Sequence, residues 1–300
     1  MLHAPLSRAQ SLLAAGGMCA VSLVFLLFIA SPVQAALGMT GLLLTELGLL
    51  ALALGGAKLL GEPLRAVFPL ARPRLRPTAG AVVLWLGIYA PVLLVAILMQ
   101  LLLPQHTAEV STGITGLIST VPLWLRFLIV AVSPAICEEA VYRGFILHHL
   151  GVLPPWARVL LCGALFGVFL LDVTRFGSTA LLGGALSWAA VCTGNLFYPA
   201  LIHLCNNSVS VLATVALEMA AEAAPEAVAT GAEAAAAVTP ATLGVYFLLC
   251  APSPWLVWAG TALLQTDAPR RPGRAKRACL CLVLTLALLA AGFALILSQG

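Results

Sequence analysis

Two glutamates and an arginine lie close together in the sequence CEEAVYRGF, residues 137–145, within a long apolar stretch. On a helix, Glu139 and Arg143 are four positions apart, so they share one face and can form an ion pair. Glu138 is rotated by about 100° from that face, and no basic residue stands four positions after it. An unpaired carboxylate in a partly dry site can take a proton from water, which is the chemistry of a general base.

Two other interpretations of this charged cluster stay open. The three side chains can form a network of ion pairs that fixes helix packing, or a carboxylate can line a transport pathway. An ionisable side chain in the hydrocarbon region costs from about 2.5 kcal/mol upward, so each interpretation requires a cavity or a partner. The motif alone does not decide among the three.

A histidine and an asparagine form a second candidate pair, in the sequence LIHLCNNSV, residues 201–209. His203 and Asn207 are four positions apart and share a helix face within another apolar stretch. A single histidine in such a place is more often a packing residue than a catalytic one. As a pair, the two side chains offer hydrogen-bond donors that can stabilise an oxyanion in a site of low dielectric constant.

Membrane helices must position these residues, because the chain is 62% hydrophobic and only 9% charged. Soluble domains are about 45–50% apolar and about 25% charged. The deficit of charge extends along the whole chain, and strand-like alternation is absent. We therefore expect an all-α polytopic membrane protein with about 8–9 transmembrane helices. Nine segments are candidate spans: 11–31, 41–61, 78–103, 123–147, 159–171, 178–194, 197–217, 241–264 and 278–298.

Two of these candidate spans, 159–171 and 178–194, are short, and we expect them to be tilted, partial or re-entrant. The first span resembles a signal peptide, but its apolar run is longer than the 7–15 residues typical of one. We therefore interpret it as a transmembrane span that is retained in the mature protein. The eight cysteines lie in or beside apolar segments without a CxxC pair, which favours packing over metal or redox chemistry.

The basic residues indicate the orientation of the chain. They cluster in two loops, 62–77 and 265–277, at Arg65, Arg72, Arg74 and Arg76 and at Arg270, Arg271, Arg274, Lys276 and Arg277. By the positive-inside rule we expect both loops in the cytoplasm and the acidic, alanine-rich segment 218–240 on the opposite side. Both basic runs are short and abut apolar spans, so we expect no nucleic-acid partner. The expected location is a bacterial inner membrane, crossed many times.

The order of these motifs resembles the CPBP family of intramembrane proteases, which includes the type II CAAX prenyl endopeptidases and the ABI-like bacterial immunity and bacteriocin-processing proteins. The family pattern is E-E-x-x-x-R, then F-x-x-x-H, then H-x-x-x-N in successive helices. Here PAICEEAVYRGFIL, residues 134–147, is similar to the first motif, and TGNLFYPALIHLCNNSVSVL, residues 193–212, to the third. The resemblance covers about residues 123–217 and implies an endopeptidase that uses a glutamate-activated water.

The resemblance also implies a role for each residue. Glu138 would be the general base, and Glu139 and Arg143 would shape and orient the site. His203 and Asn207 would bind the oxyanion that forms when water attacks a peptide carbonyl.

The middle motif departs from the family pattern. LFGVFLLDVTRFGST, residues 165–179, resembles it through Phe166, but the histidine position holds Leu170. In the family that histidine helps the glutamate to hold the attacking water, and leucine cannot form a hydrogen bond. Asp172, His148 and His149 are poorly placed to substitute for it. We therefore expect weak or conditional proteolysis, and the alternative is a degenerate member that binds a peptide or a membrane partner without cutting it.

Three further expectations complete the sequence-based description. We divide the chain into N-terminal helices with a basic loop (1–122), a CPBP-like core (123–217), and an acidic loop with C-terminal helices (218–300). We expect no cofactor and no tightly bound metal, because no HExxH motif occurs and three zinc ligands are not evident; only a weakly bound divalent metal is left open. The expected partners are the lipid bilayer and a membrane protein or peptide substrate, and an N-terminal likeness suggests an ABC-transporter component.

Overall fold

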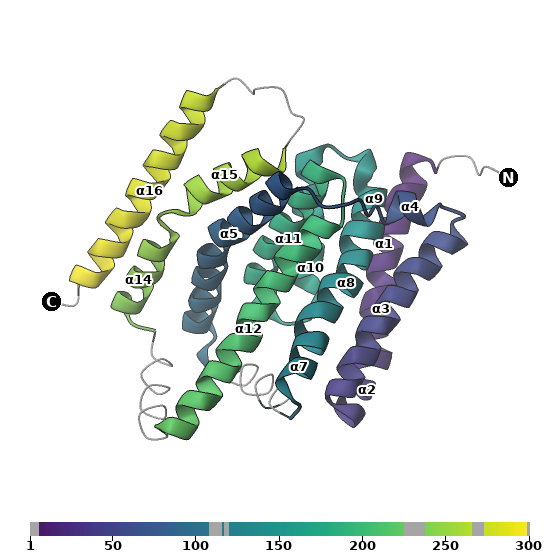
Figure 1. The fold of residues 1–300 in the computed structure, drawn as a ribbon, viewed down its shortest axis with the longest axis horizontal. Helices are drawn as coiled ribbons and strands as arrows, with labels where there is room; N and C mark the ends of the chain where they lie inside the picture. Colours follow the sequence, from purple (N-terminus) through teal and green to yellow (C-terminus); the bar gives the residue numbers. More distant parts are fainter. Residues whose placement is uncertain (1–5, 108–115, 117–119, 225–237, 266–272, 299–300) are drawn as a thin grey trace.

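The computed structural model describes residues 6–107, 116, 120–224, 238–265 and 273–298, and these residues form helices without any strand (Figure 1). The N-terminal part comprises α1 (Arg8–Phe25), η1 (Leu26–Ala30), α2 (Ser31–Leu37), α3 (Met39–Leu59), α4 (Leu64–Val67) and α5 (Leu75–Leu102). The middle part comprises α7 (Leu123–Arg126), η2 (Phe127–Val132), α8 (Ser133–Glu139), η3 (Ala140–Ile146), α9 (Leu147–His149), η4 (Leu150–Val152), α10 (Pro155–Phe169), α11 (Val173–Thr193) and α12 (Phe197–Ala223). The C-terminal part comprises α14 (Pro240–Cys250), α15 (Ser253–Leu264) and α16 (Arg274–Leu297).

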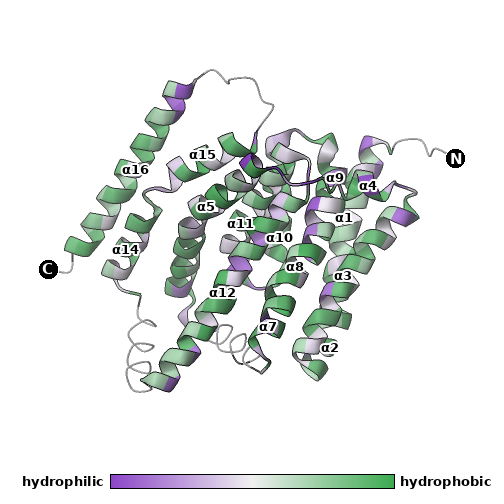
Figure 2. Cartoon of the chain, viewed as in Figure 1, coloured by the Kyte–Doolittle hydropathy of each residue, from purple (hydrophilic) through white to green (hydrophobic). Residues whose placement is uncertain are grey.

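Seven helices among the described residues are long and apolar enough to cross a membrane, so the chain is a multi-pass membrane protein. Most residues along these helices are hydrophobic (Figure 2). The expected span 123–147 corresponds to a helical run from α7 to α9 that alternates between α and π winding, and the expected span 159–171 corresponds to α10, which has 15 residues. Neither belongs to the seven, so the count of nine stays a prediction.

Two boundaries differ from the sequence-based expectation. The segment 178–194 is not short, because α11 begins at Val173 and has 21 residues. Asp172 caps this helix: its Oδ1 accepts a hydrogen bond from the Thr174 N–H at 2.9 Å, which stabilises a polar first turn that an apolar pattern cannot reveal. The expected span 241–264 corresponds to one of the seven candidate spans, Pro240–Leu264, but its helix is interrupted at Pro252, between α14 and α15.

The described basic residues of the two loops gather at one end of the bundle. The starts of α5 and α16 and the end of α15 lie at the end where α1 begins (Figure 1). There, the Arg76 guanidinium donates to the Ala262 carbonyl at 3.3 Å. At the opposite end, Glu218 pairs with Arg126 at 2.6 Å. Arg270, Arg271 and most of the acidic segment, 225–237, lie outside the described residues.

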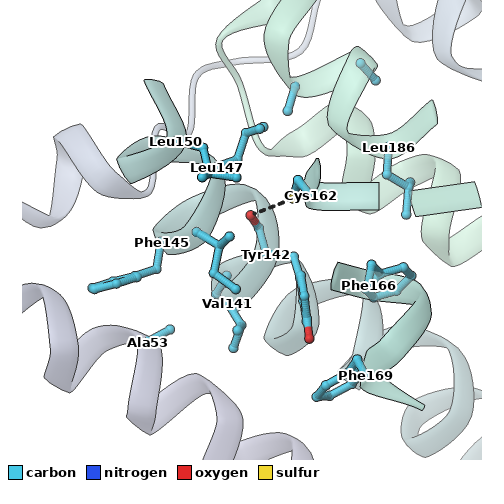
Figure 3. Packing of buried hydrophobic residues seen from close by; sticks show 14 of the residues in the cluster. Ala53, Val141, Tyr142, Phe145, Leu147, Leu150, Cys162, Phe166, Phe169 and Leu186 are labelled. Carbon is cyan, nitrogen blue, oxygen red and sulfur yellow. Dashed lines mark hydrogen bonds between the residues drawn. The ribbon is translucent and has the colours of Figure 1, made fainter. Parts of the chain in front are cut away.

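One hydrophobic core is shared by the N-terminal, middle and C-terminal parts, since Leu49, Leu186 and Leu264 all belong to it. Figure 3 shows its centre, where the Tyr142 ring packs edge-on against Phe166 and Phe169, with centroids 5.0 and 5.2 Å away. α1 contributes to the same core, so the first segment is an integral part of the bundle. α10 and α11 approach closely at two glycines: a Cβ on Gly163 would lie 2.7 Å from the Gly184 nitrogen.

Candidate active site

The charged cluster lies where α8 passes into η3, and all three of its charged side chains are buried. From Ala140 to Ile146 the chain has π winding, a widened turn that is frequent at functional sites. Glu139 and Arg143 still face each other, because the Arg143 Nη1–H donates to Glu139 Oε1 at 2.7 Å. The ion pair expected from the spacing of four residues is therefore present.

Arg143 also reaches two neighbouring helices. Its Nη2–H donates to the Gly183 carbonyl of α11 at 2.9 Å, and its Nε–H donates to Ser187 Oγ at 3.3 Å. The guanidinium lies 4.4 Å from the ring centroid of Phe166, on α10, a distance at which a cation is attracted to an aromatic ring. These contacts use one N–H of each guanidinium nitrogen, and the side chain does not line the cavity, so Arg143 anchors the helices. Gly183 and Ser187 were not predicted from the sequence.

His203, on α12, completes the network around Glu139. Its Nδ1 lies 2.9 Å from Glu139 Oε1, the oxygen that already accepts from Arg143. A carboxylate can only accept hydrogen bonds, so we assign Nδ1 as a donor. The other ring nitrogen, Nε2, lies 3.9 Å from Glu138 Oε2. The network thus turns Nε2 of His203 toward Glu138.

A cavity of about 690 Å³ opens in front of this network. Glu138, His203 and Asn207 line it, and so does Leu170, whereas Glu139 and Arg143 are not among its lining residues. The five site residues predicted from the sequence are therefore brought together in two layers. Glu138, His203 and Asn207 face the cavity, and the Glu139–Arg143 pair lies behind them.

Asn207 is held by polar contacts on both sides of its amide. Its Nδ2 donates to the Val130 carbonyl of η2 at 3.0 Å, and its Oδ1 accepts from Asn206 Nδ2 at 3.3 Å. An amide nitrogen carries two N–H groups, so one remains for a ligand in the cavity. Asn206, which also lines the cavity, was missed by sequence reasoning.

Glu46 is a second carboxylate in the cavity wall and was also missed. It lies on α3, is only 3% exposed, and lines the cavity together with Glu138. Among the described residues, its Oε2 has no hydrogen-bond partner. Glu46 could have been identified by the rule that was applied to Glu138. An ionisable residue inside an apolar span usually faces a cavity or a partner.

The residues near the missing histidine position lie as follows. Leu170 ends α10 and packs partly against the core beside the cavity. Asp172 is engaged in capping α11 and does not line the cavity. His148 and His149 lie near Glu62, with their Nε2 atoms 3.6 and 3.2 Å from its Oε2. None of these three polar residues takes the place of the histidine.

The donor set does not fit a catalytic zinc ion. Such an ion takes three protein ligands and keeps a fourth position open. Within the part of the chain that the structure describes, no three His, Cys, Asp or Glu side chains are grouped so as to hold a metal. We therefore assign no step of the chemistry to a metal.

Comparison with known proteins identifies the segment that carries this site. Residues 120–209 match the family model described as type II CAAX prenyl endopeptidase Rce1-like. No curated protein and no solved structure matches the chain. The matched segment includes the charged cluster, Leu170, His203 and Asn207, and it is an Rce1-like domain of the CPBP family.

Proposed function

We propose that this chain is an intramembrane endopeptidase in which Glu138 activates a water molecule. The observation that supports this function is the division of the site into two layers. Glu138 lines the cavity, whereas Glu139 is engaged by both Arg143 and His203. A carboxylate that faces a cavity, with hydrogen-bond donors beside it, has the arrangement that general-base catalysis requires.

In the proposed reaction, Glu138 accepts a proton from water while the water oxygen bonds to the peptide carbonyl carbon. The carbonyl electron pair moves onto oxygen, and the free N–H of Asn207 donates to this oxyanion. His203 donates to it from Nε2 when the ring is an imidazolium, because its Nδ1–H is already given to Glu139. When the C–N bond breaks, Glu138 returns the proton to the leaving amine, so the base is regenerated.

We infer that the substrate is a membrane protein or a membrane-tethered peptide, since the cavity is formed by spanning helices. We further infer nine crossings of a bacterial inner membrane, with the basic end of the bundle in the cytoplasm. A place beside an ABC-transporter permease stays a prediction from the N-terminal sequence. The division of the chain after residues 122 and 217 also stays a prediction.

Leu170 supports a second candidate function, a degenerate protease that binds a peptide without cutting it. Leucine in the cavity wall offers no hydrogen bond to a water. Under this alternative, substrates would still enter the cavity, and the charged network would serve only to hold the helices together.

One experiment separates the two functions. The protein, reconstituted in liposomes, is incubated with a library of membrane-tethered peptides, and cleavage is followed by mass spectrometry beside the Glu138→Gln variant. The amide of glutamine has nearly the same shape but cannot accept the proton. Endopeptidase function predicts cleavage that the variant lacks, whereas equal product from both proteins would leave only the binding function.

A further inference from the structure

We propose that Glu46 and Glu138 form a carboxyl pair that carries one proton at rest, on Glu46, and holds the attacking water between the two groups, in the place left by Leu170. This inference rests on the proposed endopeptidase function and assigns Glu46 to it. Glu46 belongs to α3, outside the segment 120–209 that matches the family model.

Glu46 lies in the wall of the same cavity as Glu138. α3 packs against α8 and η3, so Glu46 and Glu138 enter one cavity from neighbouring helices. Both are buried, at 3% and 8% exposure. An acid buried to this extent, on a helix that must cross a membrane, has to meet a partner or a polar cavity.

The second observation is an oxygen atom of Glu46 that needs a hydrogen-bond partner. Its Oε2 is buried and has no hydrogen-bond partner among the described residues. The neighbouring Thr45 hydroxyl is already engaged, since it accepts from Gln34 Nε2 at 2.8 Å and donates to the Gly41 carbonyl at 3.0 Å. A buried polar atom without a partner is costly, and water in an adjoining polar cavity is the usual remedy.

Charge repulsion decides the protonation of the pair. Two carboxylates that face one site of low dielectric constant cannot both be ionised, so one of them keeps a proton. Arg143 and His203 lie on the Glu138 side of the cavity, which favours the ionised form there and leaves the proton on Glu46. A neutral Glu46 then accepts one water hydrogen through its carbonyl oxygen, while ionised Glu138 accepts the other.

This arrangement leaves a lone pair of the water oxygen free for attack on the substrate. Glu138 takes one proton as the new C–O bond forms and later passes it to the amine. Glu46 keeps its own proton throughout, so the reaction balances without another reactant. Glu46 therefore provides the second hydrogen bond that leucine cannot provide at position 170.

Kinetic tests compare four variants with the wild type in the liposome assay. Glu46→Leu should lower kcat by about 10²-fold, the lower end of what positioned acid–base groups contribute. Glu46→Gln should retain most of the activity, because its amide oxygen can still accept from water. Adding Leu170→His to Glu46→Leu should restore about 10²-fold, whereas loss of a merely structural contact would not be rescued from another helix. Glu62→Gln, which removes a carboxyl near His149 instead, is the matched control and should leave cleavage unchanged.

An infrared measurement tests the protonation of Glu46 without relying on cleavage. Wild-type protein at neutral pH should show the C=O stretch of a protonated carboxyl group that Glu46→Gln removes and Glu138→Gln alters. Absence of that band, or its persistence in Glu46→Gln, would overturn the carboxyl pair. If Glu46→Leu cleaves as fast as the wild type, Glu46 does not hold the water, although the endopeptidase function stands. If wild type and Glu138→Gln cleave equally, the proposed function itself fails.

Discussion

Replacing Leu170 by histidine should increase proteolysis that depends on Glu138. Leu170 caps the C-terminal end of α10 with helical backbone angles (φ −73°, ψ −7°), which histidine can adopt without strain. Its side chain lines the cavity that contains Glu138, so an imidazole there can reach a water held by that carboxylate. The cavity also offers solvent to the second ring nitrogen, which limits the cost of placing a polar ring at this site.

The size of the increase follows from one hydrogen bond. A hydrogen bond to a charged group contributes about 1.5–3 kcal/mol, and about 1.4 kcal/mol corresponds to a factor of ten in rate. If Glu46 already holds the water, the new bond is partly redundant, and we expect the lower limit, about tenfold in kcat. In the Glu46→Leu background the same substitution should have the larger effect.

Cleavage of a tethered peptide by reconstituted protein measures this increase, and Leu170→Phe is the matched control. Phenylalanine places a ring at the same position without a nitrogen atom, so a change in cavity shape alone would affect both variants. Equal rates for the histidine and phenylalanine variants would refute the hydrogen-bond reasoning. A histidine variant no faster than Glu138→Gln would show that no catalytic water is held beside position 170.

Three further predictions concern the supporting structure. Arg143→Met should destabilise the protein by about 3–5 kcal/mol, because it leaves Glu139 as a buried charge without its ion-pair partner. Thermal unfolding in detergent measures this loss of stability, which should be smaller for Arg143→Lys. Gly163→Ala should cost about 1–3 kcal/mol by overpacking α10 against α11, whereas Gly55→Ala, whose Cβ would meet nothing within 4 Å, should not destabilise. Cysteines introduced at Arg65 and Glu222 should be labelled from opposite faces of the membrane. Labelling of both from one face would contradict the orientation.

Contacts within one helix could be predicted from the sequence, and contacts between helices could not. A spacing of four residues is sufficient to place Arg143 beside Glu139, and the structure has this pair at 2.7 Å. The bond from His203 to the same carboxylate joins residues 64 positions apart, and no local pattern specifies which helices become neighbours. The family resemblance supplied part of that information, because it brought three motifs to one site.

Glu46 shows a different limit of sequence reasoning. A single acid in an apolar span carries the same energetic signal as the charged cluster, but no second charged or polar residue beside it forms a recognisable motif. Helix boundaries were missed for a related reason. The apolar pattern begins at residue 178, whereas the helix begins at Val173 because a polar cap at Asp172 satisfies its first turn. Polar residues that support structure look the same in sequence as residues that end a span.

The charges inside this membrane protein fall into a group that supports the fold and a group that faces the cavity. Arg143 and Glu139 form an ion pair behind the cavity wall, and His203 contacts the same carboxylate from the cavity side. Glu138 and Glu46 line the cavity, and so does Arg175. A network that served packing alone would gain nothing from two further acids placed at its edge, because each adds a desolvation cost. The two acids in the cavity wall are therefore better explained by chemistry in the cavity than by stability of the bundle.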